Sequence, residues 1–275
     1  MHGSILPSGQ TREPVPLRES VLGVPVDVLS WTEATDRIFG WARERESRAI
    51  CICNVHSIIT ARGDAAHANA IKTADLITPD GAPVAWMLRK IGHVHQERIS
   101  GPDLMWACCR KASTVGTEMF LYGGSPNTLQ RLEQRLRTEF PGISIVGAYS
   151  PPFRDLSSDE DTAVVDMINR SGARIVWVGL GCPKQEAWMH AHHHLVNAVM
   201  VGVGAAFDFH AGVVERAPLW MRRNGLEWVH RLLQDPRRLA ARYLVGNSIF
   251  ITAVLADWLS RHERRVGQRR RVTRS

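Results

Sequence analysis

The segment from Arg174 to Glu186 holds the residues whose order most clearly indicates chemistry. Its short apolar run, Ile-Val-Trp-Val, is typical of a strand buried on both faces of a parallel sheet. Gly179 and Gly181 follow and allow a tight turn that a ligand can approach closely, and Pro183 suits the first position of a helix. Because a helix N-terminus presents unpaired N–H groups and the positive end of the helix dipole, we predict a phosphate site here.

The same glycines would also suit a tight turn without a ligand. Lys184 could add a cation, and Gln185 and Glu186 could hydrogen-bond to a sugar or to a base edge. A dinucleotide fingerprint would need a third Gly or Ala where Lys184 stands, and an acid about twenty residues further on at the end of the next strand. The acid in that region, Asp208, instead follows a second glycine turn. We therefore predict a phosphorylated ligand other than NAD.

Asp80 is a second candidate for chemistry, because Pro79 and Gly81 on either side of it form a rigid loop. Such a loop would hold a carboxylate towards a cleft. Taken alone, the residues favour the alternative of a turn aspartate that hydrogen-bonds to its own backbone. Arg98 offers a cation, while Asp103 falls in the first turn of a predicted helix, where an acid complements the dipole.

No metal site is predicted. His190 and His194 have i, i+4 spacing within a run of four histidines, but neither an HExxH motif nor a cysteine pattern accompanies them, which favours a solvated helix end. The run Asp159-Glu-Asp161 has the acid-x-acid spacing of a metal-binding pair. It follows two serines where a helix should begin, so dipole-complementing acids explain it better.

Strands and helices alternate along the chain, which predicts the α/β class with a Rossmann-like, doubly wound parallel sheet. The pattern indicates a helix over 31–45, opened by a capping box of Ser30 and Glu33, and another helix over 57–69. Ligands of such sheets lie beyond the carboxyl ends of the strands. That rule gathers six residues along one rim: Asn54, Asp80, Gly123, Tyr149, Gly179 and Gly204.

The charge is unevenly distributed. The 275 residues carry a net charge of +7. Residues 216–275 contain fourteen Arg, no Lys and four acids, a net charge of +10, so residues 1–215 carry −3. Five cysteines, two of them adjacent, do not resemble a disulfide framework and indicate a reducing compartment. Neither a signal peptide nor a transmembrane helix is expected, because the N-terminal residues are polar and no apolar run is long enough to span.

These observations divide the chain into four parts. We predict a flexible leader over 1–19, a Rossmann-like catalytic domain over 20–215, a helical C-terminal appendage over 216–260 and a basic disordered tail over 261–275. The stretch Leu244–Leu259 is mostly apolar and is flanked by arginines, so we expect it to seat at the surface of an anionic membrane. The alternative is an ordinary amphipathic helix that packs on the body.

Eight motifs, taken in order, resemble those of the WecG/TagA/CpsF glycosyltransferases (glycosyltransferase family 26), and the resemblance covers roughly residues 20–245. Each motif alone is weak, but eight in register are specific. The motifs are Asn54, Thr78-Pro-Asp-Gly81, Arg98-x-x-Gly-x-Asp103, Phe120-Leu-Tyr-Gly-Gly124, Gly179-x-Gly-x-Pro-Lys-Gln-Glu186, Gly202-Val-Gly-Ala-Ala-Phe-Asp208, Arg216-Ala-Pro218, and Gly225-Leu-Glu-Trp228 with Arg231.

The resemblance implies an inverting, metal-independent transfer of a sugar from a UDP-sugar to a polyprenyl-diphosphate-linked saccharide. Members build teichoic acid linkage units, enterobacterial common antigen and exopolysaccharides. By resemblance, Asp80 matches the proposed catalytic base, while Asn54 and Arg98 match polar residues of the same pocket. The residues predicted to bind the nucleotide-sugar are Gly123, Gly124, Tyr149, where an aromatic ring could stack on uracil, Gly179, Gly181, Pro183, Lys184, Gln185, Glu186, Gly204, Phe207 and Asp208.

The appendage would then stabilise the leaving diphosphate, since no cofactor or metal is expected. Its candidates to close over the UDP pyrophosphate, or to face the lipid diphosphate, are Arg216, Arg222, Arg223 and Arg231. We expect a cytoplasmic protein bound peripherally to the inner face of a bacterial inner membrane, with its oligomeric state open. Two other functions were considered. A dehydrogenase is disfavoured by Lys184, and a nucleic-acid-binding protein would leave Asp80 and the glycine turns without a role.

Overall fold

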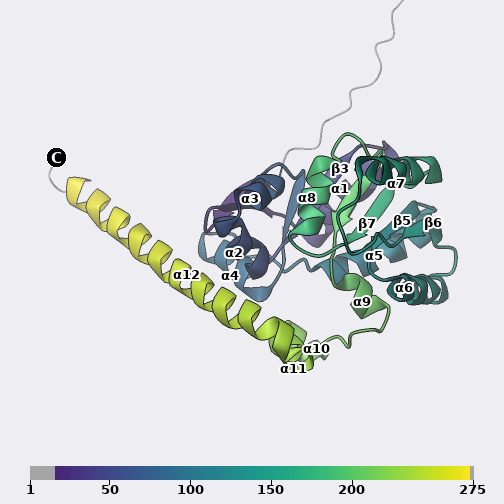
Figure 1. Ribbon diagram of the computed structural model, residues 1–275. Coiled ribbons are helices and arrows are strands. Elements are labelled where there is room, and N and C mark those ends of the chain that lie inside the picture. The colour runs from purple at the N-terminus through teal and green to yellow at the C-terminus, as the bar shows by residue number, and fades with distance from the viewer. Residues whose placement is uncertain (1–15, 273–275) are drawn as a thin grey trace, which may run out of the picture.

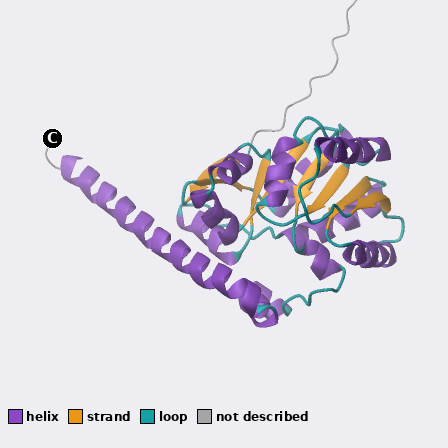
Figure 2. Cartoon of the chain, in the orientation of Figure 1, coloured by secondary structure: helices purple, strands orange, loops and turns teal. Residues whose placement is uncertain are grey.

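The computed structural model describes residues 16–272, with side chains described to residue 257 except at positions 238, 241 and 242. Its centre is a sheet of six strands, all parallel, in the order β4-β3-β8-β7-β5-β6 (Figures 1 and 2). The strands are β3 (Arg48–Cys53), β4 (Leu76–Pro79), β5 (Glu118–Gly123), β6 (Ser144–Tyr149), β7 (Ile175–Gly179) and β8 (Val199–Gly202). The predicted fold class is therefore confirmed.

Helices cover both faces of the sheet, as the nearly continuous apolar strands require. One face packs against α1 (Trp31–Arg43), α5 (Gly101–Val115), α6 (Pro126–Glu139) and α9 (Ala206–His210). The other face packs against α2 (Val55–Gly63), α3 (Ala65–Lys72), α4 (Ala82–Lys90), α7 (Ser158–Ser171) and α8 (Lys184–Ala191). The capping box predicted for α1 forms, since Ser30 and Glu33 each accept a hydrogen bond from the other's backbone N–H.

Two predicted boundaries near the N-terminal end are corrected. The first strand of a hairpin, β1 (Leu17–Val21), already begins inside the predicted leader and pairs with β2 (Val24–Val28). Arg18 fixes it there by an ion pair of 2.7 Å with the buried Asp27. Residues 1–15 of the leader lie outside the described residues. The helix predicted over 57–69 is two helices, because Asp64 ends α2 and caps α3.

The appendage consists of α10 (Leu219–Arg223), α11 (Glu227–Gln234) and α12 (Pro236–Val272). The predicted disordered tail is corrected, because α12 continues to Val272, while residues 273–275 lie outside the described part. In Figure 1, α12 runs past α2 and away from the body. Phe250 packs into the core beside α2. None of the helices within the described residues combines the length and the hydrophobicity that a membrane span requires.

Candidate active site

The loops that follow β3 and β4 bring Asn54 and Asp80 together. The backbone N–H of Asp80 donates to the Cys53 carbonyl over 2.9 Å, which ties one loop to the other. Asn54 caps α2 by accepting from the Ser57 N–H at 3.1 Å. Its side chain lies close enough to the Asp80 carboxyl group to lower the pKa of that group. The cap therefore holds the amide group of Asn54 in place beside Asp80.

The pKa of the Asp80 carboxyl group is raised to about 6. Its removal from water raises the pKa most, the charge of Arg98 lowers it, and the charge of Glu227 raises it again. Part of the residue still reaches the surface, as a group that meets a substrate must. A carboxylate with this pKa is mostly ionised at neutral pH and is still basic enough to accept a proton, which suits a general base.

Arg98 lies next to this loop because Ile99 donates its backbone N–H to the Pro79 carbonyl at 2.9 Å. Its guanidinium group donates to Glu227 at 3.1 Å and to Asp103 at 3.4 Å. Glu227 is the first residue of α11, so the appendage contributes directly to the surroundings of Asp80. The sequence placed Glu227 in a motif but gave it no role.

Asp103 is the centre of an ionic cluster between body and appendage. Arg216 donates to both its carboxylate oxygens, at 2.7 and 2.8 Å, and the Ser100 hydroxyl donates at 2.5 Å. Burial raises the pKa of Asp103, but these bonds and the nearby charges of Arg216 and Arg98 lower it to about 2. Asp103 is thus held as a carboxylate that binds the appendage, a role that the dipole interpretation missed.

The appendage also approaches the Asp80 loop closely at Gly225. A Cβ there would lie 2.7 Å from the Cβ of Ala82, the first residue of α4, and Gly225 has φ +71°. A cavity of about 510 Å³ opens beside this contact. Its charged lining consists of Arg89, Glu97, Arg98, Asp103, Arg222 and Arg223. Four guanidinium groups against two carboxylates favour an anionic occupant.

The predicted nucleotide side of the rim is built by close packing around Phe207, which is buried. A Cβ on Gly179 would meet the Phe207 ring at 2.6 Å, and one on Gly123 would meet the Gly179 backbone at 2.6 Å. Gly124 also lies against this ring. Close packing therefore requires glycine at positions 123 and 179, and it allows the C-terminal ends of β5 and β7 to approach each other.

The side chains after Gly181 differ in where they point. Lys184 is exposed, whereas Gln185 and Glu186 are buried. Gln185 accepts from the Gly181 N–H at 3.2 Å and donates to Glu186 at 2.9 Å, so it braces the turn. A Cβ on Gly204 would lie 3.3 Å from Gln185. Pro183 is the N-cap of α8, one residue before the predicted position.

Three further residues of the predicted site make contacts of their own. Tyr149 is half-buried and its ring is parallel to that of Tyr122, with centroids 6.3 Å apart. Asp208 accepts from the Thr128 hydroxyl at 3.4 Å. Arg231 lies over the ring of Phe209, 5.1 Å from its centroid.

The histidine run is more tightly bound than a solvated helix end would be. His192 is buried and pairs with Asp161 at 2.8 Å, and His193 pairs with Asp75 at 2.9 Å. Glu160 forms the capping box of α7 with Ser157, as expected for first-turn acids. The one group of at least three residues able to hold a metal ion, among those described, is elsewhere and consists of His67, Cys182 and Glu186.

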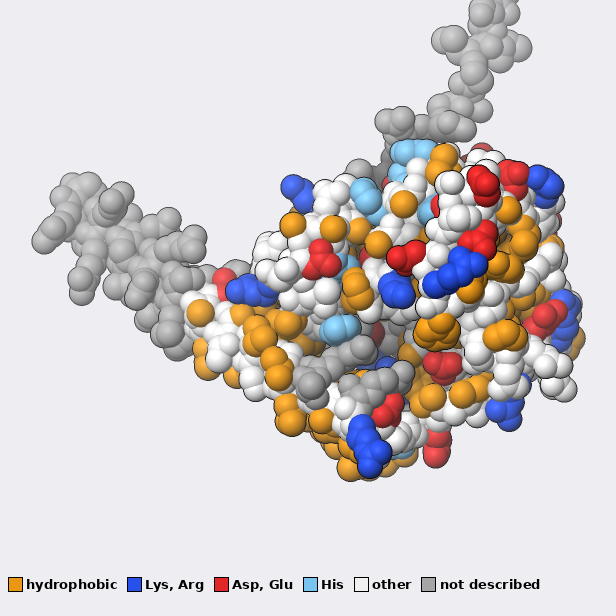
Figure 3. Space-filling model, viewed as in Figure 1, with side chains coloured by type: hydrophobic (Ala, Val, Ile, Leu, Met, Phe, Trp, Pro, Cys, Tyr) orange, Lys and Arg blue, Asp and Glu red, His pale blue; other side chains and the backbone are white. Residues whose placement is uncertain are grey.

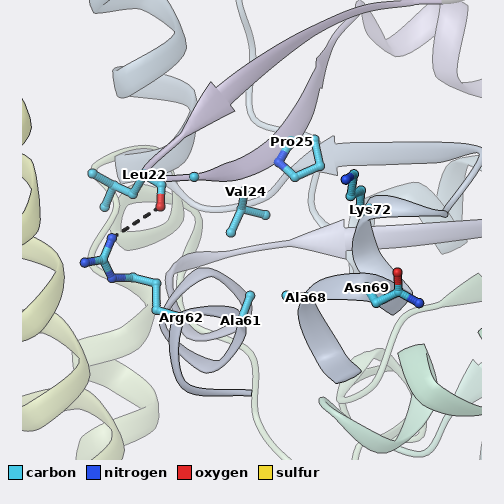
Figure 4. Close-up of a pocket in the computed structure, with 9 residues that line it drawn as sticks. Leu22, Val24, Pro25, Ala61, Arg62, Ala68, Asn69 and Lys72 are labelled. Carbon is cyan, nitrogen blue, oxygen red and sulfur yellow. Dashed lines mark hydrogen bonds between the residues drawn. The ribbon is translucent and has the colours of Figure 1, made fainter. Parts of the chain in front are cut away.

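A second hollow, of about 370 Å³, lies between the β1–β2 turn and helices α2 and α3 (Figure 4). Arg62 reaches across one end of it and donates to the Leu22 carbonyl at 3.3 Å. None of the residues predicted to bind or react lines this hollow. The cavity beside the Gly225–Ala82 contact is lined by three residues of the predicted site, Arg98, Arg222 and Arg223, and is therefore the one that agrees with the sequence.

Comparison with known proteins adds two findings. The model of the glycosyl transferase WecG/TagA/CpsF family matches residues 19–264. The chain is also similar to the N-acetylglucosaminyldiphosphoundecaprenol N-acetyl-beta-D-mannosaminyltransferase of Bacillus spizizenii. The two are 36% identical over 195 residues, which are 70% of this chain and 71% of the relative.

Proposed function

The chain belongs to the WecG/TagA/CpsF family of glycosyltransferases, and from this premise we propose the reaction that it catalyses. It transfers an N-acetylhexosamine from a UDP-sugar to a polyprenyl-diphosphate-linked saccharide, with inversion at the anomeric carbon, in the synthesis of a cell-surface polysaccharide. The relative's name supports the class of acceptor and sugar. The observation that carries the proposal is the Asp80 carboxyl group, which is desolvated and has a pKa of about 6 at the rim of the sheet.

In the proposed reaction, Asp80 is the general base. The acceptor hydroxyl oxygen attacks the anomeric carbon while its proton passes to the Asp80 carboxylate. The new glycosidic C–O bond forms as the bond from that carbon to the UDP oxygen breaks, and its electron pair leaves with UDP. Attack from the face opposite UDP inverts the configuration. Asn54 orients the carboxyl group, and Glu227 keeps it basic.

The negative charge that develops on the diphosphate needs stabilisation, and we assign this role to arginines in place of a metal ion. The cavity beside the Gly225–Ala82 contact joins Arg89 and Arg98 of the body to Arg222 and Arg223 of the appendage. The described residues provide no hydrogen-bond partner for the buried Nε atom of Arg222. We therefore favour Arg222 and Arg223 as ligands of a diphosphate, while Arg216 holds the appendage through Asp103.

We also propose that the appendage binds peripherally to the cytoplasmic face of the membrane, where a lipid-linked acceptor resides. Apolar side chains are exposed along the described part of α12, as Figure 3 shows in orange. They are Leu244, Val245, Ile249, Ile251 and Leu255. Apolar area next to basic sequence is the combination that seats a helix at an anionic bilayer. This surface coexists with the packing of Phe250 on the body.

The reaction is tested by incubating the protein with a panel of UDP-sugars, a polyprenyl-diphosphate-linked N-acetylglucosamine and EDTA. We expect release of UDP from one N-acetylhexosamine donor, dependent on the acceptor, and a product whose new anomeric centre is inverted by NMR. Retention of configuration would contradict a single displacement with one base. Loss of activity in EDTA that only added Mg²⁺ or Mn²⁺ restores would replace the arginine assignment with a metal-assisted one.

A further inference from the structure

Three side chains able to bind a metal ion meet on the face of the sheet that α3 and α8 cover. His67 belongs to α3, Cys182 to the turn before α8, and Glu186 to the first turn of α8. One donor atom of each lies within 4.8 Å of the other two. The side chains of His67 and Glu186 are each only 1% exposed, whereas Cys182 is partly exposed. The group is therefore enclosed but can be reached from the thiol side.

Local structure holds each of these side chains in place. Asp64 caps α3 by accepting from the backbone N–H groups of Ala66 and His67, at 2.9 and 3.0 Å, which fixes where His67 lies in the first turn. Gln185 donates to one oxygen of Glu186, Oε1, at 2.9 Å. The other oxygen, Oε2, is then turned towards His67.

Two buried atoms of this group, His67 Nδ1 and Glu186 Oε2, have no hydrogen bond within the described residues. His67 Nε2 lies 3.7 Å from the Cys182 sulfur. Its Nδ1 lies 4.0 Å from Glu186 Oε2, which is too long for a hydrogen bond, and the described residues provide no other partner for either atom. An unpaired buried polar atom costs about 1–3 kcal/mol. A cation among these atoms would remove this penalty.

We propose that His67, Cys182 and Glu186 form a Zn²⁺ site. Thiolate, imidazole and carboxylate are the three ligand types of protein-bound zinc, whereas Mg²⁺ and Ca²⁺ prefer sets of oxygens. On binding, the Cys182 S–H bond breaks, the sulfur bonds to the metal and the proton goes to solvent. The thiolate and the carboxylate then balance the two positive charges. Water would complete a four-coordinate site from the exposed side of Cys182.

The site would join α3 to the glycine turn that begins α8. Its ligands are distinct from Asp80 and from the arginines of the cavity. Glu186 is also one of the residues predicted to bind the nucleotide-sugar, and in this proposal its carboxylate binds the metal instead. The proposal rests on the local geometry and does not depend on the proposed reaction. It departs from the sequence-based expectation of no metal. That expectation considered the histidine run and the acidic run, but not a group that combines residues from two distant segments.

The test is metal binding by the full-length chain without a histidine tag. After removal of metals with a chelator, Zn²⁺ is titrated in competition with a chromophoric chelator, and Co²⁺ is used to detect a thiolate-to-metal absorption band. We expect one tightly bound equivalent, a higher melting temperature with Zn²⁺, and the Co²⁺ band. Cys182→Ser and His67→Asn should weaken binding by more than the roughly 10–100-fold that loss of an outer-shell partner causes. Cys182→Ser should also remove the band.

His193→Asn is the matched control, because His193 pairs with Asp75 away from this group. It should leave affinity and band unchanged. Circular dichroism establishes that each variant is folded. The proposal is wrong if the folded wild type takes up no tight equivalent of Zn²⁺, or if binding survives Cys182→Ser and is lost in His193→Asn. Rapid alkylation of Cys182 in a protein that binds no Zn²⁺ would replace the site with a metal-free thiol–imidazole–carboxylate group.

Discussion

The two halves of the rim are built on different principles. The charged half, at the ends of β3 and β4, consists of Asn54, Asp80 and Arg98 together with Asp103 and Glu227. The glycine half, at the ends of β5, β7 and β8, consists of Gly123, Gly124, Gly179 and Gly204 around Phe207 and Gln185. In the first, position is set by hydrogen bonds and charges from three segments. In the second, it is set by van der Waals contact.

This difference separates two properties that a transferase needs. The charged half tunes proton affinity, so that two aspartates there have pKa values of about 6 and about 2. Which value each takes depends on its partners, since Arg216 bonds directly to Asp103 but not to Asp80. The glycine half contributes shape, because it lets backbone and ring approach without side chains between them. Substitutions in the charged half should therefore alter proton transfer, whereas substitutions in the glycine half should alter packing and ligand affinity.

The largest effect is expected for Asp80→Asn. The amide has nearly the shape of the carboxyl group but cannot accept the acceptor's proton, so the rate should fall by roughly 10²–10⁴-fold. UDP affinity should persist, because the glycine half is intact. Rates of UDP release and calorimetric UDP binding measure the two properties. The exposed Asp36→Asn, on α1, is the matched control. Unchanged turnover in Asp80→Asn would remove the base assignment.

Gly179→Ala should instead disturb the close packing of the glycine half around Phe207. Its new methyl group would meet the Phe207 ring at 2.6 Å, and overpacking of this kind costs about 1–3 kcal/mol of unfolding free energy. UDP affinity should fall with stability, which denaturant unfolding and calorimetry measure.

Gly40→Ala is the matched control, because a Cβ there meets nothing within 4 Å inside α1. It should stabilise by roughly 0.5–1 kcal/mol. In the double variant Gly179→Ala/Phe207→Leu, the smaller leucine leaves room for the new methyl group. This variant should recover part of the lost unfolding free energy. Full stability of Gly179→Ala alone would contradict the packing account.

The sequence predicts structure correctly where one segment determines its own conformation. The apolar runs ending at Asn54, Asp80 and Gly179 gave strands, and the rule for parallel sheets placed their ends on one rim, as the strand order confirms. The sequence does not predict contacts between segments that lie far apart along the chain. The ion pair of Asp103 with Arg216 joins residues 113 positions apart, and neither residue type reveals its partner.

The same limit explains the other differences. A helix-breaking cap at Asp64 looks like any polar residue within an amphipathic run, so α2 and α3 were predicted as one helix. The His67, Cys182 and Glu186 group comes from two segments 115 residues apart, without a spacing motif. The direct binding roles of Gln185, Glu186 and Phe207 stay predictions, since packing already accounts for their burial.

Asp103→Asn should loosen the appendage. It removes the bidentate partner of Arg216, and a broken buried pair costs about 3–5 kcal/mol, reduced here to roughly 1–3 kcal/mol because Asp103 remains about one third exposed. The folded-state pKa of about 2 lies below the ordinary 3.8. The stabilisation is therefore present above pH 3.8 and lost as pH falls towards 2. Thermal unfolding of wild type and variant should converge over that range, while exposed Asp166→Asn changes little.

The smallest and most specific effect is expected for Glu227→Gln. Glu227 raises the pKa of Asp80 by its charge and also engages Arg98. Removing the charge, and freeing Arg98 to act on Asp80, both lower that pKa. Because the base must be ionised, wild-type activity should decline as pH falls through about 6, and the decline should move to lower pH in the variant. Glu227→Asp, which keeps the charge, should move it less. A shift to higher pH would mean that Glu227 acts on Asp80 through position and not through charge.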